Sequence, residues 1–231
     1  ASASLPPKAS SMTRRNRRKI GYVRTDTLQA QEGEETIKVM LTGETPFIGA
    51  AFLSDEAGEV LEIKTQLVGR HNFNNIMTAI ALGIYFKVPA IKIKAAIEAY
   101  TPANNRSQLL NRGSNTIFLD AYNANPSSMK PALESLQAMP GEKKIAILGD
   151  MLELGEESLK EHEAIVRFAA KQKPDVLVLV GPEFGRTNFK KYGAFHFPDT
   201  ASAKIWFENE KFENCLILIK GSRGMRLETL V

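Results

Sequence analysis

The sequence predicts an α/β protein that begins with antiparallel strands and helices and ends with a mostly parallel sheet. Two observations carry this prediction. Between residues 20 and 68 the pattern is that of β-strands, and at residues 61–67 apolar residues alternate with polar ones, which is the period of a half-buried strand. From residue 115 onward, short apolar runs are separated by stretches of helical spacing, the pattern of a parallel sheet covered by helices on both faces.

Composition and charge narrow the class of protein. The 231 residues are 43% hydrophobic and 24% charged, which is ordinary for a globular protein. The single cysteine, Cys215, excludes an internal disulfide and a cysteine cluster for a metal, and we expect a buried structural thiol. No apolar run approaches the roughly 18 residues of a membrane helix, and residues 1–7 lack a signal-peptide core. We therefore expect a cytoplasmic protein with no membrane partner.

Residues 1–19 form a basic lead-in that we expect to be poorly ordered, because Ser, Pro and Arg dominate it. Its cluster of cations between Arg14 and Lys19 supplies much of the net charge of +4. Such a run could contact nucleic acid, but no aromatic platform or recognised nucleic-acid motif accompanies it. We expect no nucleic-acid partner. The alternative is a nucleic-acid binder whose affinity falls steeply with salt.

Residues 20–68 predict a small antiparallel sheet with one solvent-exposed face. Strands are expected at residues 36–42 and 47–54, then a turn at 55–58, then a third strand at 61–67.

Two helices are expected next. The first begins near His71, and the second begins at Pro89, which suits a helix start. The expected inner faces are Ile76, Ala79, Ile80, Gly83 and Ile84 in the first helix, and Ile93, Ala96, Ile97 and Tyr100 in the second. Because residues 101–108 are polar and irregular, we place a domain boundary after residue 105.

The second part alternates strands with helices. The expected strands are residues 116–120, 144–149, 175–180 and 216–220, with a shorter one near 194–197. One helix is expected at residues 158–171. Another begins at Pro126, which suits a first helical turn, after Asn125, which suits the cap before it.

The segment Asp120-Ala121-Tyr122-Asn123-Ala124-Asn125-Pro126 forms the turn between a predicted strand and this helix. In an open α/β sheet, ligands bind beyond the carboxyl ends of the strands. Asp120, Tyr122, Asn123 and Asn125 are therefore candidate site residues. The alternative is an ordinary polar turn with a good helix cap.

Two more strand ends are expected at the same edge. Asp150 directly follows a strand, and with Asp120 it could orient a cation or a substrate amine; the alternative is a loop carboxylate in water. Around the end of the last strand lie Lys220, Ser222 and Arg223, where we expect a helix start whose free amides and cations favour an anion. The alternative is a capped helix with exposed cations.

Asn72 and Asn75 lie three residues apart at a predicted helix start and so share one face. Each amide offers a donor and an acceptor, which suits the edge of a purine base. The alternative is a helix cap and an ordinary polar contact. We expect His71 to be a structural, hydrogen-bonding histidine. The sequence contains no Gly-x-x-x-x-Gly-Lys-Ser/Thr phosphate loop, no Gly-x-Gly-x-x-Gly, and no His-x-x-x-His or Cys-x-x-Cys spacing.

In this order and at this spacing, the motifs resemble the C-terminal portion of a Mur ligase. The resemblance covers roughly residues 35–231. The matching segments are 69–75 with the helix after it, Asn105-Arg106-Ser107, 120–126 with Ser128-Met129, 148–155, and 220–223. Within the family, Asp-x-Tyr-Asn-Ala-Asn-Pro is typical of the branch that adds D-alanyl-D-alanine to UDP-N-acetylmuramoyl-tripeptide.

The resemblance implies a domain organisation. Residues 20–105 would be the tail of a central ATPase domain, and residues 106–231 a Rossmann-like C-terminal domain that is truncated at its end. The family's phosphate loop, magnesium-binding Glu and carbamylated Lys would lie upstream, so no metal ligand is assigned in this chain. We therefore expect a fragment that is inactive when isolated, and separately we expect a monomer.

The resemblance also implies an activity in peptidoglycan precursor synthesis. The reaction is ATP-dependent amide formation, with ATP and Mg2+ as cofactors and UDP-N-acetylmuramoyl-tripeptide and D-alanyl-D-alanine as substrates. The tripeptide carboxylate would become an acyl phosphate, which the dipeptide amine then attacks. The class left open beside it is a non-catalytic nucleotide- or peptide-binding module, which ATP turnover by the isolated chain would exclude.

Site roles follow from the same resemblance. The residues implied to bind the nucleotide are Asn72, Asn75, Arg106, Asp120, Tyr122 and Asn123. Those implied to bind the substrates are Asn125, Asp150 and Ser222, and those implied to be catalytic are Lys220 and Arg223. We expect the replacement of Lys220 by alanine to lower turnover and to change folding little, because a strand end lies outside the core.

Overall fold

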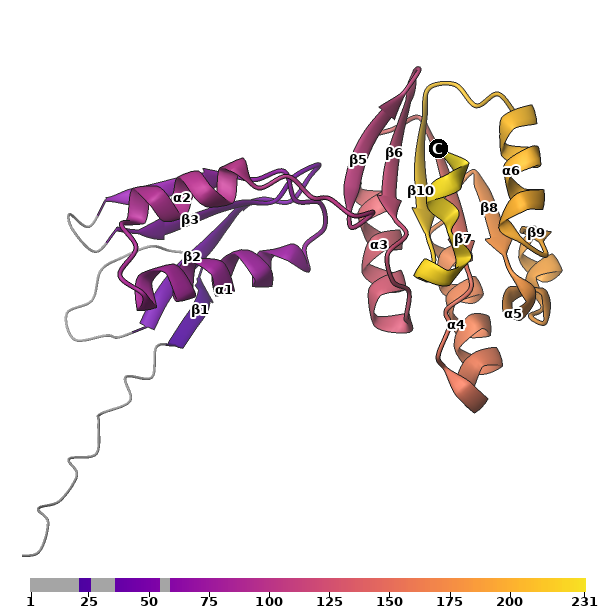
Figure 1. Ribbon diagram of the computed structural model, residues 1–231, viewed down its shortest axis with the longest axis horizontal. Helices are drawn as coiled ribbons and strands as arrows, with labels where there is room; N and C mark the ends of the chain where they lie inside the picture. Colours follow the sequence, from indigo (N-terminus) through magenta and orange to yellow (C-terminus); the bar gives the residue numbers. More distant parts are fainter. Residues whose placement is uncertain (1–20, 26–35, 55–58) are drawn as a thin grey trace, which may run out of the picture.

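The computed structural model describes residues 21–25, 36–54 and 59–231, and this part of the chain contains two separate sheets (Figure 1). The expected basic lead-in at residues 1–19 and the expected turn at residues 55–58 lie outside the described residues. None of the helices among the described residues has the length and apolar character needed to cross a bilayer.

The first sheet has the strand order β1-β2-β3-β4. Its strands are β1 (Gly21–Thr25), β2 (Thr36–Gly43), β3 (Gly49–Leu53) and β4 (Val60–Lys64). The last three pair in antiparallel fashion, as predicted, whereas β1 pairs with β2 in parallel. Alternation of apolar residues shows which face a side chain takes, but it does not show the direction of the neighbouring strand.

Two helices, α1 (Asn72–Tyr85) and α2 (Ala90–Ala99), pack on this sheet where helices were expected. The residues of this core are Val39, Ile48, Ala50, Phe52, Ile63, Phe73, Ile76, Met77, Ile80 and Ile93. The prediction was wrong for Ala79, Ala96 and Tyr100, which are exposed. In α1 the larger apolar side chains of Phe73 and Met77 bury more surface than an alanine does, so they face the sheet instead.

The second sheet has the strand order β5-β6-β10-β7-β8-β9. Its strands are β5 (Gln108–Arg112), β6 (Asn115–Asp120), β7 (Lys143–Gly149), β8 (Val176–Val180), β9 (Phe195–Phe197) and β10 (Cys215–Lys220). The five strands from β6 to β10 are parallel to one another and match the predicted ones. The sequence did not predict β5, an antiparallel edge strand, because most of its residues are polar.

Helices cover both faces of the second sheet (Figure 1). On one face lie α3 (Pro126–Ala138) and α4 (Ser158–Lys171); on the other lie α6 (Thr200–Asn209) and the short 3-10 helix η4 (Leu227–Leu230). Within β10, Leu216 and Leu218 pack toward α3 and α4, whereas Ile217 and Ile219 pack toward the opposite face. The short helices α5 (Pro182–Gly185), η1 (Gly155–Glu157), η2 (Phe189–Tyr192) and η3 (Arg223–Met225) lie in loops.

The segment between α2 and β5 joins the two sheets, and no described strand belongs to both. Asn104, Asn105 and Ser107 have φ angles of 57°, 58° and 48°, a left-handed conformation that Asn tolerates better than most residues. The side chain of Gln108 accepts from the amide of Asn105 and donates to the carbonyl of Pro102. The segment is therefore shaped by its own hydrogen bonds.

Candidate functional site

The carboxyl ends of β6, β10 and β7 meet at one edge, where the strand register places Lys220 beside Asp120 and Leu148. The ammonium of Lys220 donates to Asp120 Oδ2 at 2.6 Å and to the carbonyl of Asn123 at 2.9 Å. Asp120 Oδ1 also accepts from the backbone amide of Ser107 at 3.1 Å. Asp120 therefore joins β6 to β10 through the ion pair with Lys220, and it joins β6 to the inter-sheet segment through the hydrogen bond from Ser107.

Lys220 is only 1% exposed, which corrects the expectation of a cation lying open at a strand end. A buried ammonium requires a partner of opposite charge, and Asp120 supplies it from the neighbouring strand. Its charge is therefore already neutralised within the protein.

Two exposed guanidinium groups converge on Tyr122 at the same edge. The Cζ atom of Arg106 lies 3.7 Å from the centre of the Tyr122 ring, and that of Arg223 lies 5.3 Å from it. Hydrogen bonding to Arg106, the charge of Arg106 and then the charge of Arg223 lower the pKa of the Tyr122 phenol. Because both cations are open to solvent, the pair offers a site for an anion such as a phosphate or carboxylate.

Asn72 and Asn75 share one face at the start of α1, as their spacing predicted. Asn75 Nδ2 donates to Asn72 Oδ1 at 2.8 Å, and Asn72 Nδ2 donates to the carbonyl of Val68 at 2.7 Å. Asn72 is buried and Asn75 is exposed. Their adenine-binding role stays a prediction. In this arrangement only the side chain of Asn75, of the two, is exposed and so accessible to a ligand.

His71 lies close enough to the Asp120–Lys220 pair for their charges to act on it. Partial burial is the main cause that lowers the pKa of His71; the carboxylate of Asp120 raises it and the ammonium of Lys220 lowers it further. The sequence indicated only a structural histidine. Its approach to the sheet edge depends on how the two parts of the chain pack, and no local pattern shows that.

Asp150 was expected to be an open carboxylate, in contact with a ligand or with water, and the structure shows a fully buried one. Its oxygens accept from the backbone amides of Glu183 and Phe184, each at 2.9 Å. Burial raises the pKa of Asp150, although these two hydrogen bonds act in the opposite direction. A Cβ atom on Gly181, whose φ is 120°, would lie 2.3 Å from Asp150 Oδ2, so the glycine permits this approach.

Ser222 does not begin an α-helix, which corrects a second expectation. The chain after β10 forms η3 and η4, two short 3-10 helices. Ser222 Oγ accepts from the amide of Leu152 at 2.9 Å, and the amide of Ser222 donates to the carbonyl of Asp150 at 3.2 Å. An anion here would therefore depend on side chains more than on a row of free helix amides.

Asn125 is the N-cap of α3, as predicted, and Pro126 is its first residue. Asn125 Oδ1 accepts from the amide of Ser128 at 2.9 Å and from the hydroxyl of Ser127 at 2.8 Å. The neighbouring Asn123 is exposed, and its Oδ1 accepts from the amide of Ala124. The side-chain oxygens of both residues therefore shape the turn, and their ligand-binding roles stay predictions.

We expect Asn125→Ala to lower the free energy of unfolding by about 1 kcal/mol, because the amide of Ser128 loses its cap. Asn125→Asp keeps an acceptor at that amide and should remain close to the parent chain. Urea unfolding of both variants measures the difference. Equal stability of the two variants would contradict the assigned capping role.

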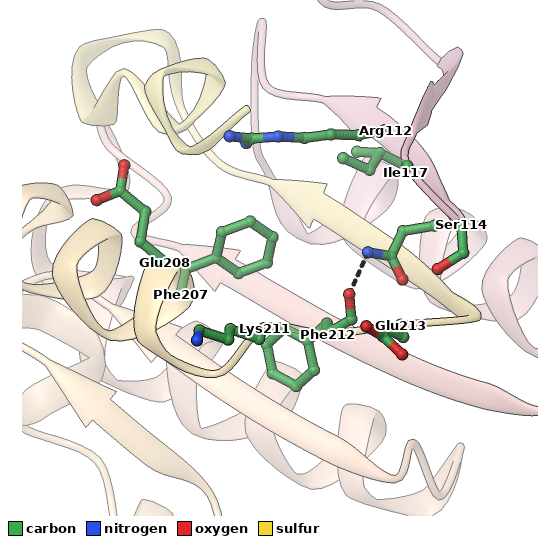
Figure 2. Close-up of a pocket in the computed structure, with 10 residues that line it drawn as sticks. Arg112, Ser114, Ile117, Phe207, Glu208, Lys211, Phe212 and Glu213 are labelled. Atoms are coloured by element: carbon green, nitrogen blue, oxygen red, sulfur yellow. Dashed lines mark hydrogen bonds between the residues drawn. The ribbon is translucent and has the colours of Figure 1, made fainter.

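Two cavities are found in the described part of the chain. Figure 2 shows one of about 510 Å³ at the amino end of β6 and β10, where Phe207, Lys211 and Phe212 form part of the wall. The dashed line marks the hydrogen bond from Asn115 to the carbonyl of Phe212. The other cavity, of about 560 Å³, lies between α1 and α3 and is partly lined by His71. None of the expected ligand-binding residues lines either cavity.

Comparison with known proteins shows the family. The family described as "Mur ligase, glutamate ligase domain" matches residues 105–223, which is more than half of the chain. The chain belongs to the Mur ligase family.

Relatives in the Mur ligase family extend the match beyond those residues. A UDP-N-acetylmuramoyl-tripeptide--D-alanyl-D-alanine ligase of Treponema pallidum is 32% identical over 174 residues, covering 73% of this chain and 38% of the relative. An enzyme of the same description from Rickettsia prowazekii is 34% identical over 181 residues, covering 74% of the chain and 39% of the relative. This chain therefore spans less than half the length of the curated relatives it matches.

Solved Mur ligase structures share the fold. MurF from Acinetobacter baumannii has a TM-score of 0.71 at 23% identity, and the match covers 91% of this chain and 50% of that one. MurF from Thermotoga maritima, solved in complex with ADP, has a TM-score of 0.65 at 19% identity and covers 84% of this chain and 47% of that one. The mixed α/β architecture expected from the sequence is thus confirmed as that of the family.

Proposed function

We propose that this chain forms the C-terminal part of an ATP-dependent ligase that adds D-alanyl-D-alanine to UDP-N-acetylmuramoyl-tripeptide. The observation that carries the proposal is the open cation pair Arg106–Arg223 around Tyr122, beside the buried Asp120–Lys220 pair at a sheet edge. Family membership and relatives described as this ligase support the reaction class. In this proposal residues 20–105 belong to a central ATPase domain and residues 106–231 to the C-terminal domain.

The two exposed arginines fit the charge that this reaction handles. A phosphoryl group and a carboxylate both carry negative charge, and guanidinium groups bind either with two parallel hydrogen bonds. Tyr122 holds the two cations near each other on one aromatic ring. The inference is that Arg106 and Arg223 bind and orient the anionic groups, and that the Asp120–Lys220 pair fixes the backbone on which they stand.

ATP would supply the phosphoryl group that activates the tripeptide carboxylate toward the dipeptide amine. The residues of this chain proposed to face it are Asn75, Arg106, Tyr122 and Arg223. No group of three His, Cys, Asp or Glu side chains suited to a metal is found within the described part of the chain. From the resemblance to the family, we propose that the Mg2+ ligands and the phosphate loop belong to the upstream part of the ligase, and that the chain alone does not turn over.

A chimera tests this function. The upstream part of the Bacillus subtilis relative, which is 32% identical to this chain over the matching region, would be joined to residues 36–231. With ATP, Mg2+, UDP-N-acetylmuramoyl-tripeptide and D-alanyl-D-alanine, we expect phosphate release and a product of the mass of the pentapeptide. The intact relative is the positive control, and the isolated 231-residue chain should form no product.

The alternative is a nucleotide- or peptide-binding module without catalysis. A folded chimera that binds ADP but forms no pentapeptide would favour that module and reject the ligase. Product from a different amino acid or peptide, in place of D-alanyl-D-alanine, would keep the ligase class and reject the substrate.

A further inference from the structure

His162 is a fully buried histidine of α4 that the proposed function does not use. The backbone amide of Met151 lies 3.0 Å from His162 Nε2, and the carbonyl of Ser158 lies 2.7 Å from Nδ1. Because a backbone amide can only donate, Nε2 is the acceptor, and the ring proton sits on Nδ1 and is donated to Ser158. Both ring nitrogens are thus hydrogen-bonded. The ring of Phe184 packs edge-on against the imidazole, with 4.6 Å between the two ring centres.

The loop that His162 holds, residues 150–152, also holds the end of the last strand. Leu152 donates its amide to Ser222 Oγ at 2.9 Å, and the carbonyl of Asp150 accepts from the amide of Ser222 at 3.2 Å. Ser222 directly precedes Arg223, whose guanidinium lies over Tyr122. A short series of hydrogen bonds therefore runs from the protein interior to Ser222, the residue before the exposed cation.

The loop is fixed at its other side as well. The carboxylate of Asp150 accepts hydrogen bonds from the backbone amides of Glu183 and Phe184, and its Oδ1 lies 3.7 Å from His162 Nε2. If the imidazole is lost, the buried amide of Met151 has no acceptor, and leaving such a group unpaired is costly. We expect the loop to relieve this cost by moving, and Ser222 moves with it because two hydrogen bonds join them.

We propose that His162 is a positioning residue that sets Arg223 over Tyr122 through the loop at residues 150–152 and Ser222. Its effect on the ligase reaction rests on the proposed function: a displaced Arg223 would hold the anionic substrate group less well. The positioning itself is a property of the folded chain and can be measured without ATP or substrate.

The phenol of Tyr122 reports where Arg223 lies. The charge of Arg223 lowers the pKa of Tyr122, so moving that charge away should raise it. The measurement is an NMR titration of the 231-residue chain labelled with 13C at the tyrosine ring, in which Tyr122→Phe identifies the resonance. Arg223→Ala gives the size of the rise when the charge is absent altogether.

His162→Leu removes the acceptor for the Met151 amide, and we expect the pKa of Tyr122 to rise as it does in Arg223→Ala. His162→Gln offers an amide oxygen to the same donor, and we expect it to restore the parent value. Arg167→Ala, which removes an exposed cation from the same helix, should leave the titration unchanged. If His162 were merely structural, replacing it would change the melting temperature without changing the pKa of Tyr122.

An unchanged Tyr122 titration in a folded His162→Leu chain overturns the proposal, and so does an unchanged titration in Arg223→Ala. If His162→Leu does not fold, Ser222→Ala removes the hydrogen bond from the Leu152 amide, the side-chain one of the two that join the loop to Ser222, with His162 intact. A raised Tyr122 pKa in that variant supports the proposal, and an unaltered one overturns it. None of these outcomes depends on ligase activity, so a failed chimera would not be mistaken for a failed positioning role.

Discussion

Lys220→Ala should lower the free energy of unfolding by about 3 kcal/mol, the scale for removing one partner of a buried ion pair. The variant leaves the carboxylate of Asp120, only 16% exposed, without its ammonium, and it leaves the carbonyl of Asn123 without its donor. This reverses the expectation, drawn from the strand-end position alone, that folding would change little. The pair joins β6 to β10, two inner strands of the second sheet, so we expect its loss to destabilise that sheet as a whole.

Urea unfolding followed by the fluorescence of Trp206 measures this loss, because the chain has one tryptophan and it packs against the core between the second sheet, α6 and η4. Lys143→Ala is the matched control, since Lys143 is an exposed lysine of the neighbouring strand β7 and should change stability little. Lys220→Met combined with Asp120→Asn removes both charges and should recover much of the loss. A Lys220→Ala chain as stable as the Lys143→Ala control would show that the pair contributes nothing.

Local patterns were enough to predict the elements that build the second sheet. Apolar runs indicate β6, β7, β8 and β10 because those strands are buried on both faces and read as continuous apolar segments. Asn125 and Pro126 predict the start of α3 because capping needs only a side-chain oxygen and a fixed φ. The edge strand β5 was not predicted because an edge strand needs little apolar surface. Its conformation is held by backbone pairing with β6, which the local sequence does not show.

The sequence was enough to locate the candidate site, but it did not show which of its polar side chains are buried and which are exposed. The carboxyl edge follows from parallel strands, yet which of its polar side chains face outward depends on contacts between residues far apart in the chain. Lys220 and Asp120 are 100 residues apart and meet only through the register of two strands. Asp150 turns inward because Gly181 brings the amides of α5 to it. Arg106 and Arg223 remain as the open cations, and only Arg223 was expected to be catalytic.

Arg223→Ala in the active chimera should lower kcat by about 100-fold, the size of effect seen when one electrostatic stabiliser is removed. The proposed reaction builds negative charge on the transferred phosphoryl group and then at the carbon under attack. A positioned cation stabilises that growing charge more than it stabilises the bound substrate, so its loss should fall mainly on turnover. Lys220 is less able to take this part, because Asp120 already neutralises it.

Steady-state kinetics of the chimera, measured beside its melting temperature, tests the role of Arg223. Folding should be unaffected because Arg223 is exposed, and Arg167→Ala, another exposed arginine of the same unit, should leave both quantities unchanged. A rise in KM at constant kcat would make Arg223 a binding residue without a special part in the transition state. A near-normal kcat and KM in the folded variant would remove it from the site, and Arg106, stacked 3.7 Å from the same ring, would then be the cation at this edge that contacts the anion.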